Sequence, residues 1–580
     1  TVMLSTFLVG LGLGAAGVAR FLRADPAQAR RAFYGLALLA AATLSVSAAA
    51  SQRMPDLFRS LFWSLGLPAA PGWLLPVQFA IAAALMIVPA LVMGGLFPAA
   101  LRIVIRDAAG VGRSVGGVYA WNTLGTILGS FAAGFVLIPG LGIRGALLVA
   151  AGAQCASASI VALGGAREHR AALRAAVAAC AVPLLVWLTP PWHHQLMTSA
   201  MYDYAGRHDT VGVLGLERRL AQQQELLYYR DGLTATVTVS QDIANDDGDL
   251  YITTNGKIDG SSHFDMPTQR LIAHVPLLFH PKPREVAVVG MGTGSTAGSA
   301  ALHDGVARVT VVEIEAAMVE GAKHFRAHNH AVHENPKVDI RVADGRLFLR
   351  LHPGRFDVIV SEPSNPWLAG SSDLFTTEFF RLAARALGEG GLFCQWVQLY
   401  ALSPDSLRIL VRTFADVFPH VYLASSILET DVLLLGSKEP LPLDVERAGL
   451  RLQDAQIRAD LSDPRLGIES IHGVAARFRM GPSEVRAFVG PGPLHTDDLP
   501  IIAYRAPRDL YRKTGKANEE QLARSARGIG AYVVGLPAPR TARREFFSEL
   551  AAAYAAILPG GGESRVSHQI AARLRSEPGR

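Results

Sequence analysis

Six apolar runs, each close to about twenty residues long, occupy the chain before residue 190. They are Val2–Leu22, Phe33–Ala50, Leu74–Phe97, Val115–Ile138, Ala146–Leu163 and Ala171–Leu188. A helix needs roughly 20 apolar residues to cross the hydrocarbon core of a bilayer. A soluble core could bury one such run, but it could not hide six in series. Residues 1–190 are therefore predicted to form a multi-span transmembrane helical domain, with the lipid bilayer as its partner.

The composition supports a membrane part attached to a soluble part. Only 18% of the 580 residues are charged and 50% are hydrophobic, whereas soluble domains average about 25% charged residues. The net charge is +6, but the arginines are scattered between apolar runs, so no nucleic-acid partner is expected. The 3 cysteines exclude a disulfide scaffold.

Arginines in the short loops predict the orientation of the runs. They gather in the loops after the first, third and fifth runs, and those loops should face the cytoplasm. The residues concerned are Arg20, Arg23, Arg30, Arg31, Arg102, Arg106, Arg113, Arg167, Arg170 and Arg174. Six crossings would then deliver the rest of the chain to the outside. That outcome conflicts with the cytoplasmic ligand argued below, and Ala171–Leu188 is the weakest of the six candidates.

After residue 190 the pattern changes to that of a soluble protein. Residues 191–224 are expected to be a linker, and residues 225–282 a small β subdomain that ends in a helix over Pro267–Leu278. The strand candidates alternate with period two and are separated by Asp-Gly and Asn-Gly turn signals. They are Glu225–Tyr229, Thr234–Ser240 and Asp249–Thr254.

Residues 283–430 alternate between strand and helix patterns, which predicts a doubly wound parallel sheet. The strand candidates are Glu285–Val289, Val309–Val312, Val338–Val342, Val358–Ser361 and Leu392–Gln395. The helix candidates are Ser295–His303, Ala316–Asn329 and Thr376–Leu387. Residues 431–580 are expected to be a C-terminal extension that ends in a polar tail from Gly560.

A glycine-rich loop follows the first of these strands. Gly290, Gly292 and Gly294 form a G-x-G-x-G pattern that opens a helix, where the backbone can approach a ligand closely. The next strand ends in Glu313, about twenty residues on, where a carboxylate can accept both ribose hydroxyls of an adenosine. These residues predict nucleoside binding, and both nicotinamide dinucleotides and S-adenosyl ligands use this arrangement.

Two further acidic positions follow later strands. Asp344-Gly345 comes after the third strand and could contact an adenine. Glu362 stands at the carboxyl end of the fourth strand, within Ser361-Glu362-Pro363-Ser364-Asn365-Pro366. Ligands of open α/β sheets bind at that edge.

In this combination the chain resembles the spermidine synthase (polyamine aminopropyltransferase) family over residues 225–425. The family's glycine-rich loop, E-I-D, D-G and D-S-S-D-P motifs have counterparts in order at Gly290–Ser295, Glu313-Ile314-Glu315, Asp344-Gly345 and Glu362–Pro366. Its D-G-x-x-Q, Y-x-E and G-G-x-x-x-Q motifs correspond to Asn255–Asp259, Thr268-Gln269-Arg270 and Gly391–Gln395. The whole layout resembles the bacterial membrane-fused spermidine synthase-like proteins.

The resemblance implies an α-helical transmembrane bundle followed by an α/β Rossmann-like domain of the class I S-adenosylmethionine-type transferases, with a small N-terminal β subdomain. It implies an enzyme that moves an aminopropyl group from decarboxylated S-adenosylmethionine to an amine. Glu362 would be the catalytic base, because an amine with a pKa near about 10 must lose a proton before it attacks. No metal is expected. A homodimer and a place in the bacterial inner membrane, with the soluble domain in the cytoplasm, are also implied.

The resemblance further implies which residues bind each ligand. The cofactor-binding residues would be Gly290, Gly292, Thr293, Gly294, Glu313, Asp344 and Gly345. The substrate-binding residues would be Asp259, Thr268, Gln269, Asn365 and Gln395.

The chain departs from the family pattern mainly in the half that reads the amines. Where the family has Asp in the glycine loop, Asp in D-S-S-D-P, Tyr and Glu in Y-x-E, and Gln in D-G-x-x-Q, this chain has Thr293, Asn365, Thr268, Arg270 and Asp259. Each lost anion weakens recognition of a diammonium chain by about 1–3 kcal/mol. Asp259 could return one negative charge.

Two alternatives therefore stay open. Without the loop Asp, ordinary S-adenosylmethionine could fit, which would make the protein a methyltransferase. The second alternative is a non-catalytic polyamine or nucleoside sensor, or a module coupled to transport. Transport usually needs an ionisable residue inside the membrane, and the apolar runs contain almost none.

Overall fold

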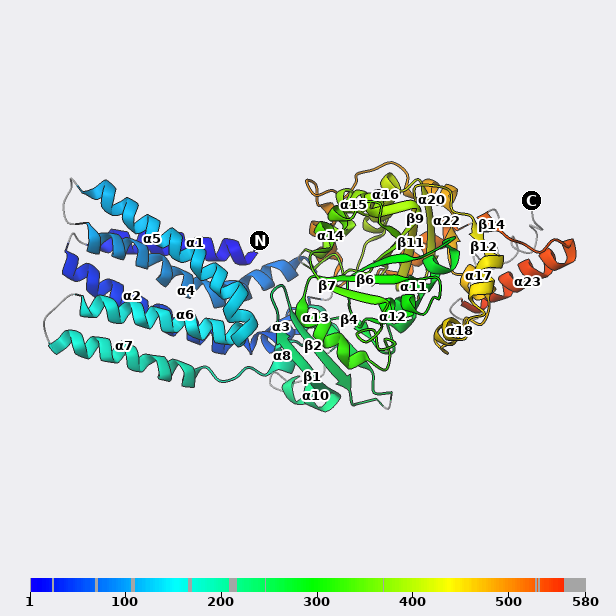
Figure 1. Ribbon diagram of the computed structural model, residues 1–580. Coiled ribbons are helices and arrows are strands. Elements are labelled where there is room, and N and C mark those ends of the chain that lie inside the picture. The colour runs from blue at the N-terminus through cyan, green and yellow to red at the C-terminus, as the bar shows by residue number, and fades with distance from the viewer. Residues whose placement is uncertain are drawn as a thin grey trace. The chain divides into compact units, whose positions relative to one another are not determined.

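The computed structural model describes residues 2–22, 25–67, 71–105, 110–164, 169–207, 216–245, 247–368, 370–526, 529 and 532–557 (Figure 1). The polar tail expected from Gly560 lies outside these residues. The chain divides into two compact units. One comprises residues 1–238 with 255–257, and the other comprises residues 239–254 with 258–580.

The first unit is mainly helical (Figure 1, blue to cyan). Its helices are α1 (Val2–Phe21), α2 (Pro26–Ser51), α3 (Met54–Ser64), η1 (Pro71–Trp73), α4 (Leu74–Val104), α5 (Val111–Ala132), η2 (Ala133–Leu137), α6 (Ile138–Leu163), α7 (His169–Leu188), α8 (His194–Met197), α9 (Met201–Tyr204), η3 (Ala205–Arg207) and α10 (Leu216–Gln223). Among the described residues, 4 helical stretches are long and apolar enough to cross a membrane. These stretches are Met3–Phe21, Pro26–Ser51, Leu74–Val104 and Val111–Leu163.

Small residues let the apolar helices of this unit pack closely. Helix α4 packs against α1 and α2, and α6 packs against α2 and α7. A Cβ atom added at Gly14 would come within 1.9 Å of the Leu91 carbonyl oxygen, and one at Gly94 within 2.2 Å of the Leu11 carbonyl oxygen. Only glycine fits at these two positions, which explains why apolar runs of this kind are rich in small residues.

The fourth and fifth apolar runs of the sequence fall within the single stretch Val111–Leu163. This stretch bends at Gly142, where φ is 72° and ψ is 171°. The Ile143 N–H that follows donates to Asp231 Oδ2 at 2.9 Å, so a side chain at the end of strand β1 (Gln224–Asp231) holds the bend. Asp231 also accepts from the hydroxyls of Tyr229 (2.9 Å) and Thr236 (2.7 Å).

The strands form two main sheets. The smaller sheet has the order β1-β2-β3-β4, in which β2 is Thr236–Asp242, β3 is Leu250–Thr254 and β4 is Lys257–Ser261. The larger sheet has eight strands in the order β13-β10-β11-β9-β8-β5-β6-β7. Its strands are β5 (Glu285–Val289), β6 (Arg308–Glu313), β7 (Val338–Val342), β8 (Phe356–Ser361), β9 (Leu387–Gln398), β10 (His420–Ser425), β11 (Asp431–Ser437) and β13 (Phe478–Met480).

The larger sheet is mixed: it contains the predicted parallel strands and further antiparallel strands that were not predicted. Strands β7, β6, β5, β8 and β9 are parallel, as the strand–helix alternation predicted. Strand β11 then pairs antiparallel with both β9 and β10, and β13 pairs antiparallel with β10. The short connection between β10 and β11 explains this, because only antiparallel neighbours can be joined by a tight turn. The sheet also extends beyond residue 430.

Helices cover both faces of the larger sheet. Helix α11 (Met266–Phe279) packs against α12 (Ser295–Ala301) and against β8, β9 and β11. On the opposite face, α15 (Thr377–Ala386) and α16 (Pro404–Val417) enclose an aromatic core with β9. Phe379, Phe380, Phe393, Phe414 and Phe418 form that core, with ring centroids 4.9–6.1 Å apart. An apolar helical part followed by an α/β domain confirms the expected fold class.

The remaining elements of this unit are short. They are α13 (Ala316–Gly321), η4 (Ala322–Phe325), α14 (Gly345–Leu351), η5 (Ser371–Phe375), β12 (Leu443–Asp444), α17 (Val445–Arg451), α18 (Ala455–Leu461), α19 (Ile471–Ala475), α20 (Pro482–Val489), α21 (Ile501–Asp509), α22 (Gly515–Ser525), β14 (Val533–Val534) and α23 (Arg540–Ile557). Helices α17 and α18 both pack against α11, so the segment after the sheet covers the helix that precedes it.

Candidate active site

The candidate site lies at the carboxyl edge of the parallel strands. Val289 at the end of β5 pairs with Val312 of β6 and with Ser361 of β8. The register therefore brings the glycine loop after Val289 beside both Glu313 and Glu362. This is the edge at which ligands of open α/β sheets bind.

The backbone of the glycine loop has conformations that favour glycine. The φ angles of Gly290, Gly292 and Gly294 are 99°, 51° and 85°. A Cβ atom at Gly290 would lie 2.9 Å from the Glu362 carbonyl oxygen, so the loop packs directly on the backbone at Glu362. Gly294 caps the N-terminus of α12.

Glu313 is buried and holds the glycine loop. Its two carboxylate oxygens accept the N–H groups of Met291 and Glu315, each at 2.8 Å. Burial raises the pKa of Glu313 to about 7, although these two hydrogen bonds oppose the rise. A carboxylate can accept about four hydrogen bonds, so Glu313 retains the capacity to bind ribose hydroxyls.

Glu362 is buried at the end of β8 and contacts helix α12. Its Oε2 lies 2.7 Å from Thr296 Oγ1, which also lies 3.0 Å from the carbonyl oxygen of Gln269 on α11. The pKa of Glu362 is raised to about 8, mainly by burial and also by the carboxylates of Asp265, Asp431 and Asp259, while the Thr296 hydrogen bond opposes the rise.

The Thr296 hydroxyl is the donor in both of its contacts. A hydroxyl group has one proton, so Thr296 donates either to Glu362 or to the Gln269 carbonyl oxygen. The raised pKa of Glu362 favours the neutral acid near pH 7, and an approaching cation favours the ionised form.

Thr293 and Gln269 are in direct contact. The Thr293 hydroxyl forms a short hydrogen bond with Gln269 Oε1 and lies 2.8 Å from Ser295 Oγ. Gln269 Nε2 donates to the Ser261 carbonyl oxygen at 3.2 Å. Helix α11 thus contacts the glycine loop through Gln269. At the loop position where the family motif has Asp, this chain has the neutral Thr293.

Two more of the expected substrate residues lie beside the loop after Glu362. Ser364 Oγ donates a hydrogen bond to Asp259 Oδ1. Asp259 therefore contacts the residue two positions after Glu362. Asn365 is fully buried and its Nδ2 donates to the Tyr400 hydroxyl at 3.2 Å. Trp367 stacks edge-on against Tyr400 at 6.1 Å.

The structure does not bring Gln395 to this site. Gln395 pairs with Ser361 in the sheet, its Nε2 donates to the Trp396 carbonyl oxygen at 3.1 Å, and it shares a face of β9 with Phe393 of the aromatic core. Asp344 caps α14 by accepting the Leu347 N–H at 2.7 Å. A Cβ atom at Gly345 would lie 2.8 Å from Val289 Cγ1, so this turn also lies close to the end of β5.

The structure thus gathers the glycine loop and two buried acids, Glu313 and Glu362, at one edge of the sheet. Residues 266–431 match the family described as "Spermine/spermidine synthase domain". A spermidine synthase of Dictyostelium discoideum is 30% identical over 29% of this chain and 58% of that protein. A polyamine aminopropyltransferase of Sodalis glossinidius is 29% identical over 39% of this chain and 75% of that protein.

The similarity to this family is confined to part of the chain. The chain spans 58% of the length of the first of these relatives. A solved structure of the spermidine synthase from Thermotoga maritima has 23% sequence identity, covers 37% of this chain and 73% of its own chain, and superposes with a TM-score of 0.33.

Two residues of α11 have side chains that contact the segment after β9. Thr268 Oγ1 lies 3.0 Å from both Asp431 Oδ2 and Ser426 Oγ. Arg270 forms ion pairs of 2.9 Å with Asp460 and Asp463. The Arg270 guanidinium is therefore paired with acids of the segment that follows the sheet.

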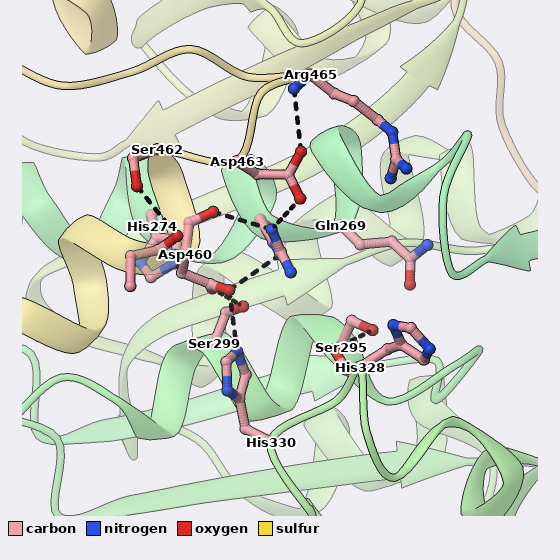
Figure 2. A network of polar contacts seen from close by, with 12 residues as sticks. Gln269, His274, Ser295, Ser299, His328, His330, Asp460, Ser462, Asp463 and Arg465 are labelled. Carbon is pink, nitrogen blue, oxygen red and sulfur yellow. Dashed lines mark hydrogen bonds and ion pairs between the residues drawn. The ribbon is translucent and has the colours of Figure 1, made fainter. Parts of the chain in front are cut away.

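Asp460 of α18 is the centre of a buried polar network (Figure 2). Besides Arg270, its carboxylate binds His274 at 2.8 Å, His330 at 3.0 Å and Ser299 at 2.6 Å. Burial disfavours the charge of Asp460, but the hydrogen bonds from the two histidines and the charge of Arg270 hold its pKa well below the ordinary value. Asp460 thus joins α18 to both α11 and the glycine-loop helix α12.

Sequence reasoning missed three residues of this site. Thr296 follows the glycine-rich loop Gly290–Ser295, and only the folded helix α12 brings its hydroxyl to Glu362. Asp431 and Asp460 lie more than a hundred residues after α11 and reach it only because the chain returns across the sheet. Within the described residues, no group of three or more His, Cys, Asp or Glu side chains could hold a metal ion.

Proposed function

We propose that this domain transfers an aminopropyl group from decarboxylated S-adenosylmethionine to an amine. The observation that carries the proposal is the buried Glu362, which contacts both the glycine loop and α12 at the carboxyl edge of the sheet. The glycine loop and Glu313 would hold the nucleoside, and Asp259, Gln269 and the loop after Glu362 would face the amine.

In this reaction the amine nitrogen attacks the propyl carbon next to the sulfonium. The new C–N bond forms as the C–S bond breaks, and the bonding electrons move to sulfur, so that methylthioadenosine leaves. The amine must be deprotonated, and a base within hydrogen-bond reach takes that proton. We assign this role to Glu362, and the assignment is supported by its raised pKa, which lies closer to that of an amine than an ordinary carboxyl pKa does.

The positively charged substrates would themselves favour the ionised, basic form of Glu362. A sulfonium or ammonium beside Glu362 stabilises the carboxylate relative to the acid and lowers its pKa. Asp259, Asp265 and Asp431 are close enough to affect Glu362 and add negative potential there. A site of this kind favours cationic substrates and leaves the base ionised once they are bound.

Identification of the product tests the proposal. The purified full chain would be incubated with decarboxylated or ordinary S-adenosylmethionine and a panel of amines, and the nucleoside product identified by mass spectrometry. Methylthioadenosine supports aminopropyl transfer. S-Adenosylhomocysteine would instead support methyl transfer, the alternative that Thr293 keeps open because it replaces an acid of the glycine loop. Neither product, with measurable nucleoside binding, would indicate a sensor.

We also propose that the first unit anchors the domain in the bacterial inner membrane with its active site in the cytoplasm. The four long apolar stretches support the anchor. Five crossings that start outside end in the cytoplasm, whereas six end outside. The bend at Gly142 allows Val111–Leu163 to cross twice. Labelling of single cysteines introduced at Asp304 and at Arg113 from either side of sealed vesicles tests this: both should be labelled from the cytoplasmic side only.

A further inference from the structure

Asp460 connects the two helices that approach Glu362, although it lies outside residues 266–431, which match the family domain. Its buried carboxylate forms ion pairs with Arg270 of α11 at 2.9 Å and with His274, one turn further along that helix, at 2.8 Å. It also accepts a hydrogen bond from Ser299 of α12 at 2.6 Å. One side chain of α18 therefore fixes α11 against α12 (Figure 2).

On each helix, a partner of this carboxylate lies within one turn of a residue that reaches the active site. On α11, Arg270 follows Gln269, whose carbonyl oxygen lies 3.0 Å from the Thr296 hydroxyl. On α12, Thr296 is three residues before Ser299, so both side chains lie on one side of the helix. The Thr296 hydroxyl lies 2.7 Å from Glu362. A shift of α11 relative to α12 would therefore disturb the contact between Thr296 and Glu362.

The C-terminal end of α11 is held separately, by Arg451 of α17. Arg451 donates hydrogen bonds to the carbonyl oxygens of Leu277 and His280, at 2.7 and 2.6 Å. Asp460 instead holds the N-terminal half of α11, which is the half that reaches the active site. Loss of the Asp460 charge therefore leaves α11 attached at one end and allows its active-site half to move.

We propose that Asp460 is a positioning residue of the transfer, which acts on Glu362 through the placement of α11 and α12 and not by contact with a substrate. This inference rests on the proposed aminopropyl transfer. It gives the segment after residue 431, which the family match does not include, a part in the reaction. Without Asp460 the two helices separate, and Thr296 loses the geometry in which it donates to Glu362.

A double-mutant cycle tests whether Asp460 acts through Thr296. kcat/KM of the full chain would be measured at pH 7 with decarboxylated S-adenosylmethionine and 1,4-diaminobutane, well below the denaturation midpoint of every variant. We expect Asp460→Asn to lower kcat/KM about tenfold in the wild type and less than about twofold in Thr296→Val, where the contact is already absent. An equal loss in both backgrounds would overturn the proposal.

A second ion pair provides the control for lowered stability alone. Glu519→Gln leaves the buried Arg479 without its partner, at a contact between α22 and β13. It should lower the denaturation midpoint while kcat/KM stays within about twofold of the wild-type value. A loss of kcat/KM equal to that of Asp460→Asn would show that lowered stability explains the effect, and the proposal would fail.

Ser299→Ala keeps the test available if Asp460→Asn does not fold. This variant removes only the hydrogen bond from α12 to Asp460 and keeps the ion pairs. We expect it to lower kcat/KM about threefold in the wild type and to have no further effect in Thr296→Val. No loss, or the same loss in both backgrounds, would contradict the inference.

Hydrogen exchange separates this inference from the proposed function. If the wild-type chain forms no methylthioadenosine, the proposed transfer fails, but the placement of the two helices can still be measured. The amides of α11 and α12 should exchange faster in Asp460→Asn than in the wild type, and at the wild-type rate in Glu519→Gln. Equal exchange in the two variants would rule out the positioning role of Asp460.

Discussion

The Thr296 hydroxyl lies 2.7 Å from the Glu362 carboxyl group and 3.0 Å from the backbone of α11. Thr296 thus connects α12, which begins at the glycine loop, to the acid at the end of β8 and to α11. Because Thr296 donates a hydrogen bond to Glu362, it favours the carboxylate and opposes the effect of burial on the pKa of Glu362.

The ionisation of Glu362 predicts the pH dependence of turnover. Its pKa of about 8 in the free protein means that the base form appears as the pH rises through about 8. kcat/KM should therefore rise with pH around that value, whereas the midpoint of kcat should be lower, because bound cations favour the carboxylate. Initial rates between about pH 6 and 9.5 measure both. Equal midpoints at ordinary carboxyl values would contradict this assignment.

The substitution Thr296→Val should move that profile. The hydrogen bond from Thr296 lowers the pKa of Glu362, so its loss should shift the kcat/KM midpoint to higher pH and reduce kcat/KM at neutral pH by roughly tenfold. Thr296→Ser retains the hydroxyl and is the matched control. An unshifted midpoint in Thr296→Val would show that the hydroxyl does not act on Glu362.

The raised pKa also has a consequence for stability. Because the folded pKa of Glu362 is about 8 and the ordinary value is 4.5, the folded protein binds more protons than the unfolded one between those values. Stability must then decrease as the pH rises through this window. Glu362→Gln removes this contribution, so the denaturation midpoint of the variant should fall less between about pH 5 and 8 than that of the wild type. Parallel pH curves would refute the raised pKa.

Asp460→Asn should destabilise the domain without touching the reacting groups. Removal of one partner of a buried ion pair costs about 3–5 kcal/mol. In the variant His274 and His330 lose their anion, and Arg270 keeps only Asp463. We expect the denaturation midpoint of the full chain to fall by roughly 5–10 °C. Asp463→Asn, at a more exposed member of the same network, should have a smaller effect. If both variants melt with the wild type, the network contributes little.

The sequence predicted the parts of this site that depend on local pattern. The predicted strand Glu285–Val289 has the same bounds as β5. The loop after this strand lies beside Glu362 because the carboxyl ends of parallel strands meet at one edge of the sheet. Contacts between residues far apart in the sequence could not be predicted, because they depend on how later segments pack on earlier ones. Arg270 meets Asp460 only because α18 packs on α11, and Asp431 faces Gln398 only because β11 inserts beside β9.

The most direct test of the account compares the wild type with Glu362→Gln. Both would be given decarboxylated S-adenosylmethionine and a diamine, with methylthioadenosine measured by mass spectrometry and nucleoside affinity by calorimetry. We expect the wild type to form methylthioadenosine and the variant to form it at least about a hundredfold more slowly, with nucleoside affinity nearly unchanged. Equal rates of methylthioadenosine formation by the two proteins would contradict it.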